Sequence, residues 1–285
     1  MCSSDLKADG RGAYRFFEPI MDAEIQERRS LESDLRTALA NHEFELFFQP
    51  MLDTTTRTLT CFEALVRWRH PGRGLVMPDK FIPLCEEIGL IIPLGAWVLQ
   101  EACRQAATWP EHIRVAVNLS PVQFRGNNLL ELVRGALDAC GLRPSRLELE
   151  IVESVLLQNT AATFETLSQL RKLGLQISMD DFGTGYSSLG YLRFFPFDKI
   201  KIDKSFVGGL GGTTHSLAIV RAILELGRTM GMAIIAEGVE TEAQFEMLQA
   251  EACTEVQGYL FSRPRPVQDV PAMIDRFARP VRIAA

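Results

Sequence analysis

The sequence has few of the residues that build disulfide-stapled or zinc-stabilised folds. Its six cysteines are scattered singly without a CxxC pair, and its four histidines are equally dispersed. No stretch therefore has the ligand spacing of a structural zinc site. We expect reduced, mostly buried thiols and a cytosolic chain, although a full-length parent could be attached to a membrane.

Long apolar runs and an excess of positive charge are also missing. The longest apolar run, IGLIIPLGAWVL at 88–99, has 12 residues and is too short to span a bilayer. No secretory signal precedes it. Lys and Arg number 30 against 36 Asp and Glu, a net charge of −6. Because non-specific DNA binding needs basic surface, we expect no DNA partner, and an anionic substrate would need metal ions between it and the protein.

What the chain does have is an alternation of short apolar runs with longer amphipathic stretches. Its 285 residues are 47% hydrophobic, enough for a sizeable core. The runs are rich in Val, Ile, Leu and Phe, as in parallel strands covered on both faces. In order they read ELFFQPML, CFEALVRW, RVAVNLS, LELEIVES, LQISMDD, KIKID, MAIIAEG and EVQGY. Eight strands with intervening helices predict an α/β fold, a (β/α)8 barrel, with a doubly wound sheet as the alternative.

Helical patterns fill the intervals between these runs. In the stretch 214–229, Ile219, Ala222, Ile223 and Leu226 fall on one helix face. The stretches 96–109 and 162–174 are similar, and the second ends at Gly174 as a helix C-terminus often does. The first 30 residues fit less well: they offer a lone short strand at 13–17 and then a charged helix over 21–39.

Polar residues stand at or near the C-terminal end of each run after the first. In a parallel barrel these ends open on one face, where catalytic residues gather. Five carboxylates, two amides and one lysine should therefore meet at one mouth. They are Glu63, Asn118, Glu150, Asp180, Asp181, Lys201, Glu237 and Gln257.

Side-chain alternation refines this placement. In LELEIVE, Glu148 and Glu150 point the same way, so Glu148 should lie one layer deeper in the barrel, while Glu153 follows the strand. By the same parity Lys199, Lys201 and Asp203 share one face of their strand, and Glu63, Leu65 and Arg67 share one face of theirs.

So many carboxylates cannot stay ionised together without cations. Oxygen ligands favour Mg²⁺ or Mn²⁺ over zinc. The adjacent Asp180 and Asp181 suit a site for two metal ions roughly 3.5–4 Å apart. Such a pair of ions stabilises the attacking and leaving oxygens of a phosphoryl transfer. Each motif alone is weak, since a DD pair is usually a turn or cap and a lone lysine is usually solvated. Eight polar groups at successive strand ends are not explained by coincidence.

The motifs together resemble a known family. EAL at 63–65, NLS at 118–120, EIVES at 150–154, DDFGTGYSS at 180–188, KID at 201–203, AEGVE at 236–240 and QGYLFSRP at 257–264 occur in order. The chain from 34 to 277 resembles the EAL-domain phosphodiesterases, which hydrolyse cyclic di-GMP to linear pGpG. The resemblance implies a TIM-like barrel with an antiparallel first strand, two Mg²⁺ or Mn²⁺ ions, inhibition by Ca²⁺, and a homodimer formed through the loop 183–188.

The resemblance also implies roles for single residues. The first metal would be held by Glu63, Asn118, Glu150 and Asp180, with Asp180 bridging to a second ion that Asp181 also holds. Lys201 would orient or activate the attacking water, while Glu237 and Gln257 complete the site and Glu153 anchors the loop 183–188. Gln49, Leu65, Arg67 and Asp203 fall where the family contacts the dinucleotide.

The N-terminal residues resemble a different domain. KADGRGAYRFFE at 7–18 is similar to the end of a GGDEF domain, but the GGDEF motif is absent, so no cyclase activity is expected. We therefore expect residues 1–33 to be a domain tail and linker helix, 34–277 the EAL domain, and 278–285 a C-terminal tail. No metal or catalytic position departs from the family pattern.

Two other functions stay open beside the phosphodiesterase. A non-hydrolysing cyclic di-GMP receptor would not need the complete set of Glu63, Glu153 and Lys201. A scaffold that only dimerises would leave the carboxylates unexplained.

Overall fold

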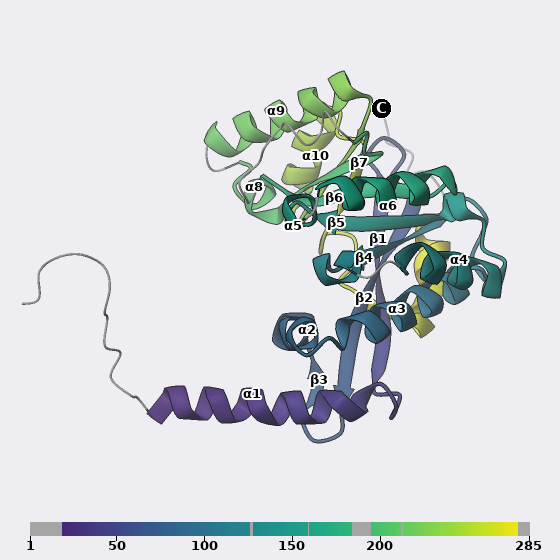
Figure 1. Cartoon of the computed structure of the whole chain (residues 1–285). Helices are drawn as coiled ribbons and strands as arrows, with labels where there is room; N and C mark the ends of the chain where they lie inside the picture. The colour runs from purple at the N-terminus through teal and green to yellow at the C-terminus, as the bar shows by residue number, and fades with distance from the viewer. Residues whose placement is uncertain (1–18, 126–127, 159, 184–194, 212–213, 279–285) are drawn as a thin grey trace, which may run out of the picture.

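Eight strands close into a barrel in the computed structural model, which describes residues 19–125, 128–158, 160–183, 195–211 and 214–278 (Figure 1). The ring runs β1, β2, β4, β5, β6, β7, β8, β9 and returns to β1. Its strands are β1 (Phe44–Asp53), β2 (Leu59–His70), β4 (Arg114–Leu119), β5 (Leu147–Val152), β6 (Gln176–Phe182), β7 (Lys199–Ile202), β8 (Ala233–Ala236) and β9 (Glu255–Gln257). All eight runs expected from the sequence form barrel strands.

The first strand is the exception to the parallel order. β1 pairs antiparallel with both β2 and β9, while every other neighbouring pair in the ring is parallel. The expected antiparallel first strand is confirmed, and the closed ring excludes a doubly wound sheet. Two short strands, β3 (Gly74–Val76) and β10 (Arg265–Pro266), extend β2 and β1.

Helices cover the outside of the barrel and bury its apolar outer face. They are α2 (Pro78–Glu87), α3 (Ile91–Ala106), α4 (Leu129–Cys140), α5 (Ser154–Gln158), α6 (Thr160–Lys172), α8 (Lys204–Gly208), α9 (Thr214–Met230), α10 (Glu242–Ala250) and α11 (Val270–Phe277). Single 3₁₀ turns lie at η1 (Pro121–Arg125), η2 (Pro144–Arg146) and η3 (Val267–Asp269). α6 ends just before Gly174, whose φ of 97° is the left-handed conformation expected there.

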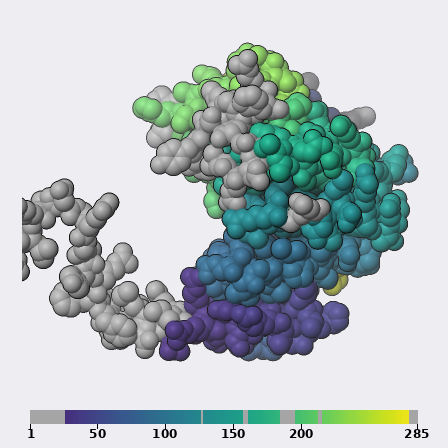
Figure 2. All heavy atoms as spheres, viewed as in Figure 1, coloured from purple at the N-terminus to yellow at the C-terminus, as the bar shows by residue number. Residues whose placement is uncertain are grey.

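The N-terminal helix α1 (Pro19–Ala38) lies along one edge, beside β3 and α2 and away from α8 to α10 (Figures 1 and 2). Its last turns bury Leu31, Leu35 and Ala38 in the main core, while Asp34 contacts the His70 ring at 3.0 Å. The expected helix is confirmed, and the expected strand at 13–17 lies outside the described residues. Among the described helices, none has the length and apolar character needed to cross a membrane.

Alternation along the parallel strands sends two layers of side chains into the barrel. The deep layer includes Glu148, Ser178, Lys199 and Glu255, all buried. The next inward position on each strand lies at the mouth. The depth expected for Glu148 is confirmed, and it places the candidate site directly above a second polar layer.

Candidate active site

The mouth of the barrel receives one inward-facing polar side chain from each strand or from the residue after it. The strand pairs bring Glu63 opposite Gln49, and Asn118 opposite Glu150. Asp180 ends the regular part of β6, and Glu237 directly follows β8. The set is Gln49, Glu63, Asn118, Glu150, Asp180, Lys201, Glu237 and Gln257.

Lys201 is the hub of this cluster. Its side chain is 1% exposed, and its Nζ lies 2.6 Å from Glu237 Oε1 and 2.8 Å from Glu150 Oε2. Asp180 Oδ1 follows at 3.3 Å and Glu63 Oε2 at 3.9 Å. One ammonium group therefore touches carboxylates from four different strands or strand ends, which fixes its position and theirs.

Burial and like charge shift the protonation of the whole group. Burial would lower the pKa of Lys201, but the carboxylates around it, Asp180 foremost, raise it well above its ordinary value. Burial raises the pKa of Glu150 well above its ordinary value and that of Glu237 to about 8, although Lys201 opposes both. Burial and the charge of Asp180 raise the pKa of Asp181. Lys201 alone therefore does not supply enough positive charge to keep all of these carboxylates ionised.

The charges at the mouth are therefore unbalanced. Five carboxylates face one ammonium at the mouth, so full ionisation leaves four negative charges uncompensated. Glu150 Oε1 is buried without a hydrogen-bond partner, as a ligand atom awaiting a cation would be. Carboxylate oxygens of Asp180, Asp181 and Glu237 also lie within 4.8 Å of one another. The donor set consists of oxygens, which fits Mg²⁺ or Mn²⁺.

Asp181 reaches this cluster through an unusual backbone conformation. Its φ is 53°, in the left-handed region that aspartate tolerates better than most residues, and its backbone N–H donates to Asp180 Oδ1 at 2.9 Å. The turn interrupts the pairing of β6 with β7 and lets two adjacent carboxylates approach the same point.

Two amides hold the remaining carboxylate. Asn118 Nδ2 donates to Glu63 Oε1 at 2.7 Å, and Gln257 Nε2 donates to Glu63 Oε2 at 2.7 Å. Gln257 Nε2 also lies 3.1 Å from Gln49 Oε1, and Gln49 Nε2 donates to the carbonyl of Ser262. Both carboxylate oxygens of Glu63 are thereby held in place by an amide.

A cavity of about 300 Å³ opens above the cluster. Glu63, Asp180 and Glu237 lie in its wall, and Lys204 and Tyr259 lie at its edge. Tyr259 is 50% exposed, and the guanidinium of Arg263 sits 4.5 Å from its ring centre. An anionic ligand with aromatic groups would meet both a metal-binding floor and a cationic, aromatic rim here.

Comparison with known proteins identifies this architecture. The model of the EAL domain matches residues 32–264. The chain belongs to the EAL domain family. It is 45% identical over 272 residues to the bifunctional diguanylate cyclase/cyclic di-GMP phosphodiesterase MucR of Pseudomonas aeruginosa, covering 94% of this chain and 40% of MucR. It is 41% identical over 283 residues to the cyclic di-GMP phosphodiesterase NbdA of the same organism, covering 98% of this chain and 36% of NbdA.

The solved structures agree with the sequence relatives. The PaMucR phosphodiesterase in complex with c-di-GMP superposes with a TM-score of 0.81 at 44% identity, covering 85% of this chain and 99% of that one. The chain spans about a third of the length of the first curated relatives it matches.

The other residues expected to contact a ligand lie in three different settings. Leu65 lines the cavity, whereas Arg67 is only 5% exposed, donates to the Val66 carbonyl at 2.9 Å and lies 5.6 Å from the Phe47 ring centre. Burial lowers the pKa of Arg67. β7 ends at Ile202, so Asp203 leaves the strand and caps α8, accepting the Ser205 N–H at 3.0 Å.

Glu153 directly follows β5 and is half-buried. The loop that it was expected to anchor lies outside the described residues from 184 onward. The anchoring role and the contact through 183–188 therefore stay predictions.

Sequence reasoning missed the ion-pair network below the mouth. Lys199 Nζ lies 2.9 Å from Glu148 Oε2 and 2.5 Å from Glu255 Oε2, and Arg114 donates to Glu255 Oε1 at 2.6 Å. Ser178 donates to the other oxygen of Glu148. Strand parity indicated that Glu148 and Lys199 point inward, but the partners on β4 and β9 depend on the barrel register.

Proposed function

We propose that this EAL domain is a metal-dependent phosphodiesterase that hydrolyses cyclic di-GMP to linear pGpG. The observation that carries the proposal is the charge of the mouth, where five carboxylates converge on one lysine. Four uncompensated negative charges suit two Mg²⁺ or Mn²⁺ ions. Two such ions would acidify a water molecule and neutralise charge on the phosphodiester.

Each residue of the mouth then has a distinct task. We assign the first ion to Glu63, Asn118, Glu150 and Asp180, and the second to Asp180, Asp181 and Glu237. Lys201, held by four carboxylates, would direct its ammonium at the attacking water and keep that water in line with the phosphorus. Water adds to phosphorus as the bond to the 3′ oxygen breaks, leaving a 5′-phosphate and a 3′-hydroxyl.

The surrounding residues would bind the dinucleotide. Gln49 and Gln257 already form one hydrogen-bonded wall of the mouth with Glu63. Leu65 offers an apolar surface in the same cavity. Arg67 and Asp203 are assigned to the dinucleotide as well, although Arg67 would have to exchange its bond to the Val66 carbonyl for one to a phosphate.

The direct test is to incubate the protein with cyclic di-GMP and Mg²⁺ and to separate the nucleotides. Linear pGpG should appear with Mg²⁺ or Mn²⁺, disappear with a chelator, and be suppressed by Ca²⁺, whose larger and more flexible coordination is unsuited to the site. Glu63→Gln and Asp180→Asn should each abolish turnover because each removes a ligand charge. Activity that survives thorough chelation would refute the two-metal mechanism.

The runner-up is a cyclic di-GMP receptor that binds without hydrolysis. Relatives named as phosphodiesterases and an intact Lys201 cluster favour the enzyme. Binding of cyclic di-GMP without any pGpG in Mg²⁺ would favour the receptor.

We also propose a cytoplasmic homodimer formed through the loop 183–188, with Glu153 anchoring that loop. The proposed boundaries are 1–33 for the tail of an upstream GGDEF-like domain and linker, 34–277 for the EAL domain, and 278–285 for the C-terminal tail. Light scattering on the isolated chain tests the dimer.

A further inference from the structure

The strand that carries Asn118 is held by only one neighbour at its end. The pairing of β4 with β2 stops at Val117, whereas its pairing with β5 continues to Leu119. Asn118 Nδ2 donates to Glu63 Oε1 at 2.7 Å. Because an ionised carboxylate can only accept, the amide oxygen of Asn118 is the atom left to bind a cation. The place of that oxygen therefore depends on what fixes the chain after β4.

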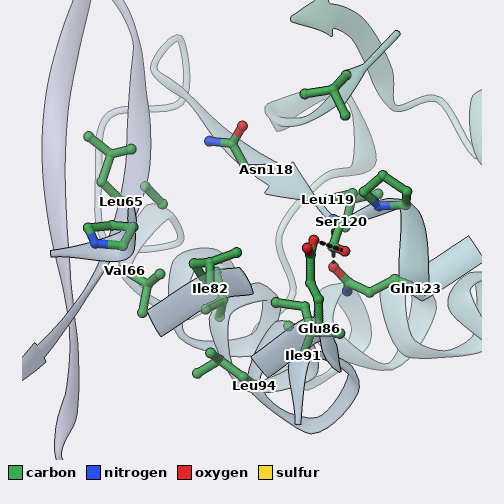
Figure 3. Close-up of a pocket in the computed structure, with 16 residues that line it drawn as sticks. Leu65, Val66, Ile82, Glu86, Ile91, Leu94, Asn118, Leu119, Ser120 and Gln123 are labelled. Carbon is green, nitrogen blue, oxygen red and sulfur yellow. Dashed lines mark hydrogen bonds between the residues drawn. The ribbon is translucent and has the colours of Figure 1, made fainter. Parts of the chain in front are cut away.

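Ser120, two residues after Asn118, has a hydrogen bond at each of its polar groups. Its backbone N–H donates to Gln123 Oε1 at 3.0 Å, and its carbonyl accepts the Gln123 backbone N–H at 3.0 Å. Its Oγ accepts the Val122 N–H at 3.1 Å and donates to Glu86 Oε1 at 2.6 Å (Figure 3). Three of these bonds stay within the turn at 120–123, whereas the bond to Glu86 comes from another element.

Two outer helices hold this turn from outside the barrel. Glu86 lies in the last turn of α2 and reaches Ser120. On the other side Gln123 is 5% exposed and packs against Gly95 of α3. A Cβ on Gly95 would lie 2.3 Å from Gln123 Nε2, so a larger residue there would displace the Gln123 side chain. The end of β4 is thus tied to both α2 and α3.

Packing alone does not explain the presence of Glu86. It lines a cavity between the strands β2 and β4 and the helices α2 and α3. The walls are otherwise mostly aliphatic, with Ile82, Ile91 and Leu94 among them (Figure 3). A half-buried carboxylate in such surroundings loses hydration that an apolar side chain would not need. The bond to Ser120 offsets part of this cost, and its consequence lies at the strand end that Ser120 fixes.

We propose that Glu86 is a positioning residue for the metal site. By holding Ser120 it fixes the end of β4 and so sets the place of the Asn118 amide oxygen beside Glu63 and Glu150. Glu86 itself lies outside the ring of strands and acts only through Ser120. The inference rests on the proposed function in one respect, the assignment of Asn118 to the first ion.

The test is the affinity for Mn²⁺, titrated by calorimetry into the intact chain without nucleotide. Glu86→Leu removes the acceptor and should weaken binding of the ion assigned to Asn118 about tenfold, the lower end of the usual effect of a group that orients a metal ligand. The ion assigned to Asp181 and Glu237 should change less. Glu86→Gln keeps an oxygen that can accept the Ser120 hydroxyl and should bind Mn²⁺ nearly as well as wild type.

The matched control is Glu87→Leu, the same change at the next residue of α2. Glu87 is exposed and forms an ion pair with Arg28 of α1, away from the mouth. Its loss removes the same charge from the same helix turn and should leave the Mn²⁺ affinity unchanged.

A double-mutant cycle separates positioning from direct attraction between Glu86 and the cation. If Glu86 acts through Ser120, Ser120→Ala should weaken Mn²⁺ binding by a similar factor, and adding Glu86→Leu should weaken it little further. If Glu86 acts by its charge alone, Glu86→Leu weakens binding equally in both backgrounds and Glu86→Gln is as weak as Glu86→Leu, which would overturn the proposal. Thermal unfolding with a chelator checks that each variant is folded, and Ser120→Ala carries the same prediction if Glu86→Leu does not fold.

Wild-type Mn²⁺ affinity in both Glu86→Leu and Ser120→Ala would also overturn the proposal, even if the protein forms pGpG. The proposed function fails separately: Mn²⁺ binding that depends on Glu86 without any pGpG would keep the positioning role and refute the enzyme. A wild-type protein that binds no Mn²⁺ would refute both.

Discussion

Glu237→Gln should make the metal-free protein more stable at alkaline pH, although it removes a proposed metal ligand. In the folded protein burial raises the pKa of Glu237 from 4.5 to about 8. Between these values the folded state keeps a proton that the unfolded state has released, so stability falls as pH rises through this window. At about 1.4 kcal/mol per pH unit, the full effect is about 5 kcal/mol. Glu150 and Asp180 share Lys201 with Glu237, so we expect about 2–5 kcal/mol.

Glutamine cannot ionise and has no such penalty. In urea denaturation with a chelator, wild type and variant should therefore differ little at pH 5, and the variant should be the more stable at pH 8.5. Saturating Mg²⁺ should reverse the order, because the cations compensate the carboxylate and bind the wild type more tightly. Glu240→Gln, an exposed neighbour, is the matched control and should show no pH-dependent gap. A gap that is equal at the two pH values would refute the reasoning.

Three further predictions concern single side chains. Lys201→Ala should lower the rate of hydrolysis about 10²–10⁴-fold, the usual range for an acid–base group, with a smaller change in cyclic di-GMP affinity; a normal rate would leave Lys201 a structural charge. Lys199→Met should destabilise the fold by about 3–5 kcal/mol in urea, because it strands buried Glu148 beside Glu255; an unchanged midpoint would mean that Arg114 alone holds both. Glu153→Ala should reduce turnover and the dimer fraction seen by light scattering, and wild-type values for both would remove its role as a loop anchor.

The sequence predicts the barrel and most of its mouth because both follow from local rules. Apolar runs of strand length, the order of the elements and polar residues at or near the strand ends place Glu150, Asp180 and Lys201 together. Glu63 joins them from the interior of β2, which continues past the mouth to His70. The two-residue period of a strand also places Glu148 below Glu150. None of these steps requires knowledge of which side chains touch.

The contacts themselves depend on the barrel register and on where each strand stops. Side-chain alternation alone predicts that Asp203 faces inward like Lys201. In the structure β7 ends at Ile202, and Asp203 caps α8 instead. The close contact of Gly95 with Gln123 is equally hidden, because the two residues meet only when α3 packs against the turn η1. Tertiary packing decides these cases, and a single sequence carries no local signal for it.

The deep polar layer and the mouth differ in charge balance, although side-chain alternation predicts only that both face inward. The deep layer pairs Arg114 and Lys199 with Glu148 and Glu255, so it is neutral. Burial would raise the pKa of Glu255, but Lys199 and Arg114 lower it, so the pair stays ionised and self-sufficient. At the mouth a single lysine contacts four carboxylates, with Asp181 beside them, so the cluster is neutral only where carboxylates keep protons or bind cations. The deep layer is electrically balanced and needs no bound ion, so its role is to stabilise the fold. The acidic layer above it opens to the cavity and is the one suited to bind metal and substrate.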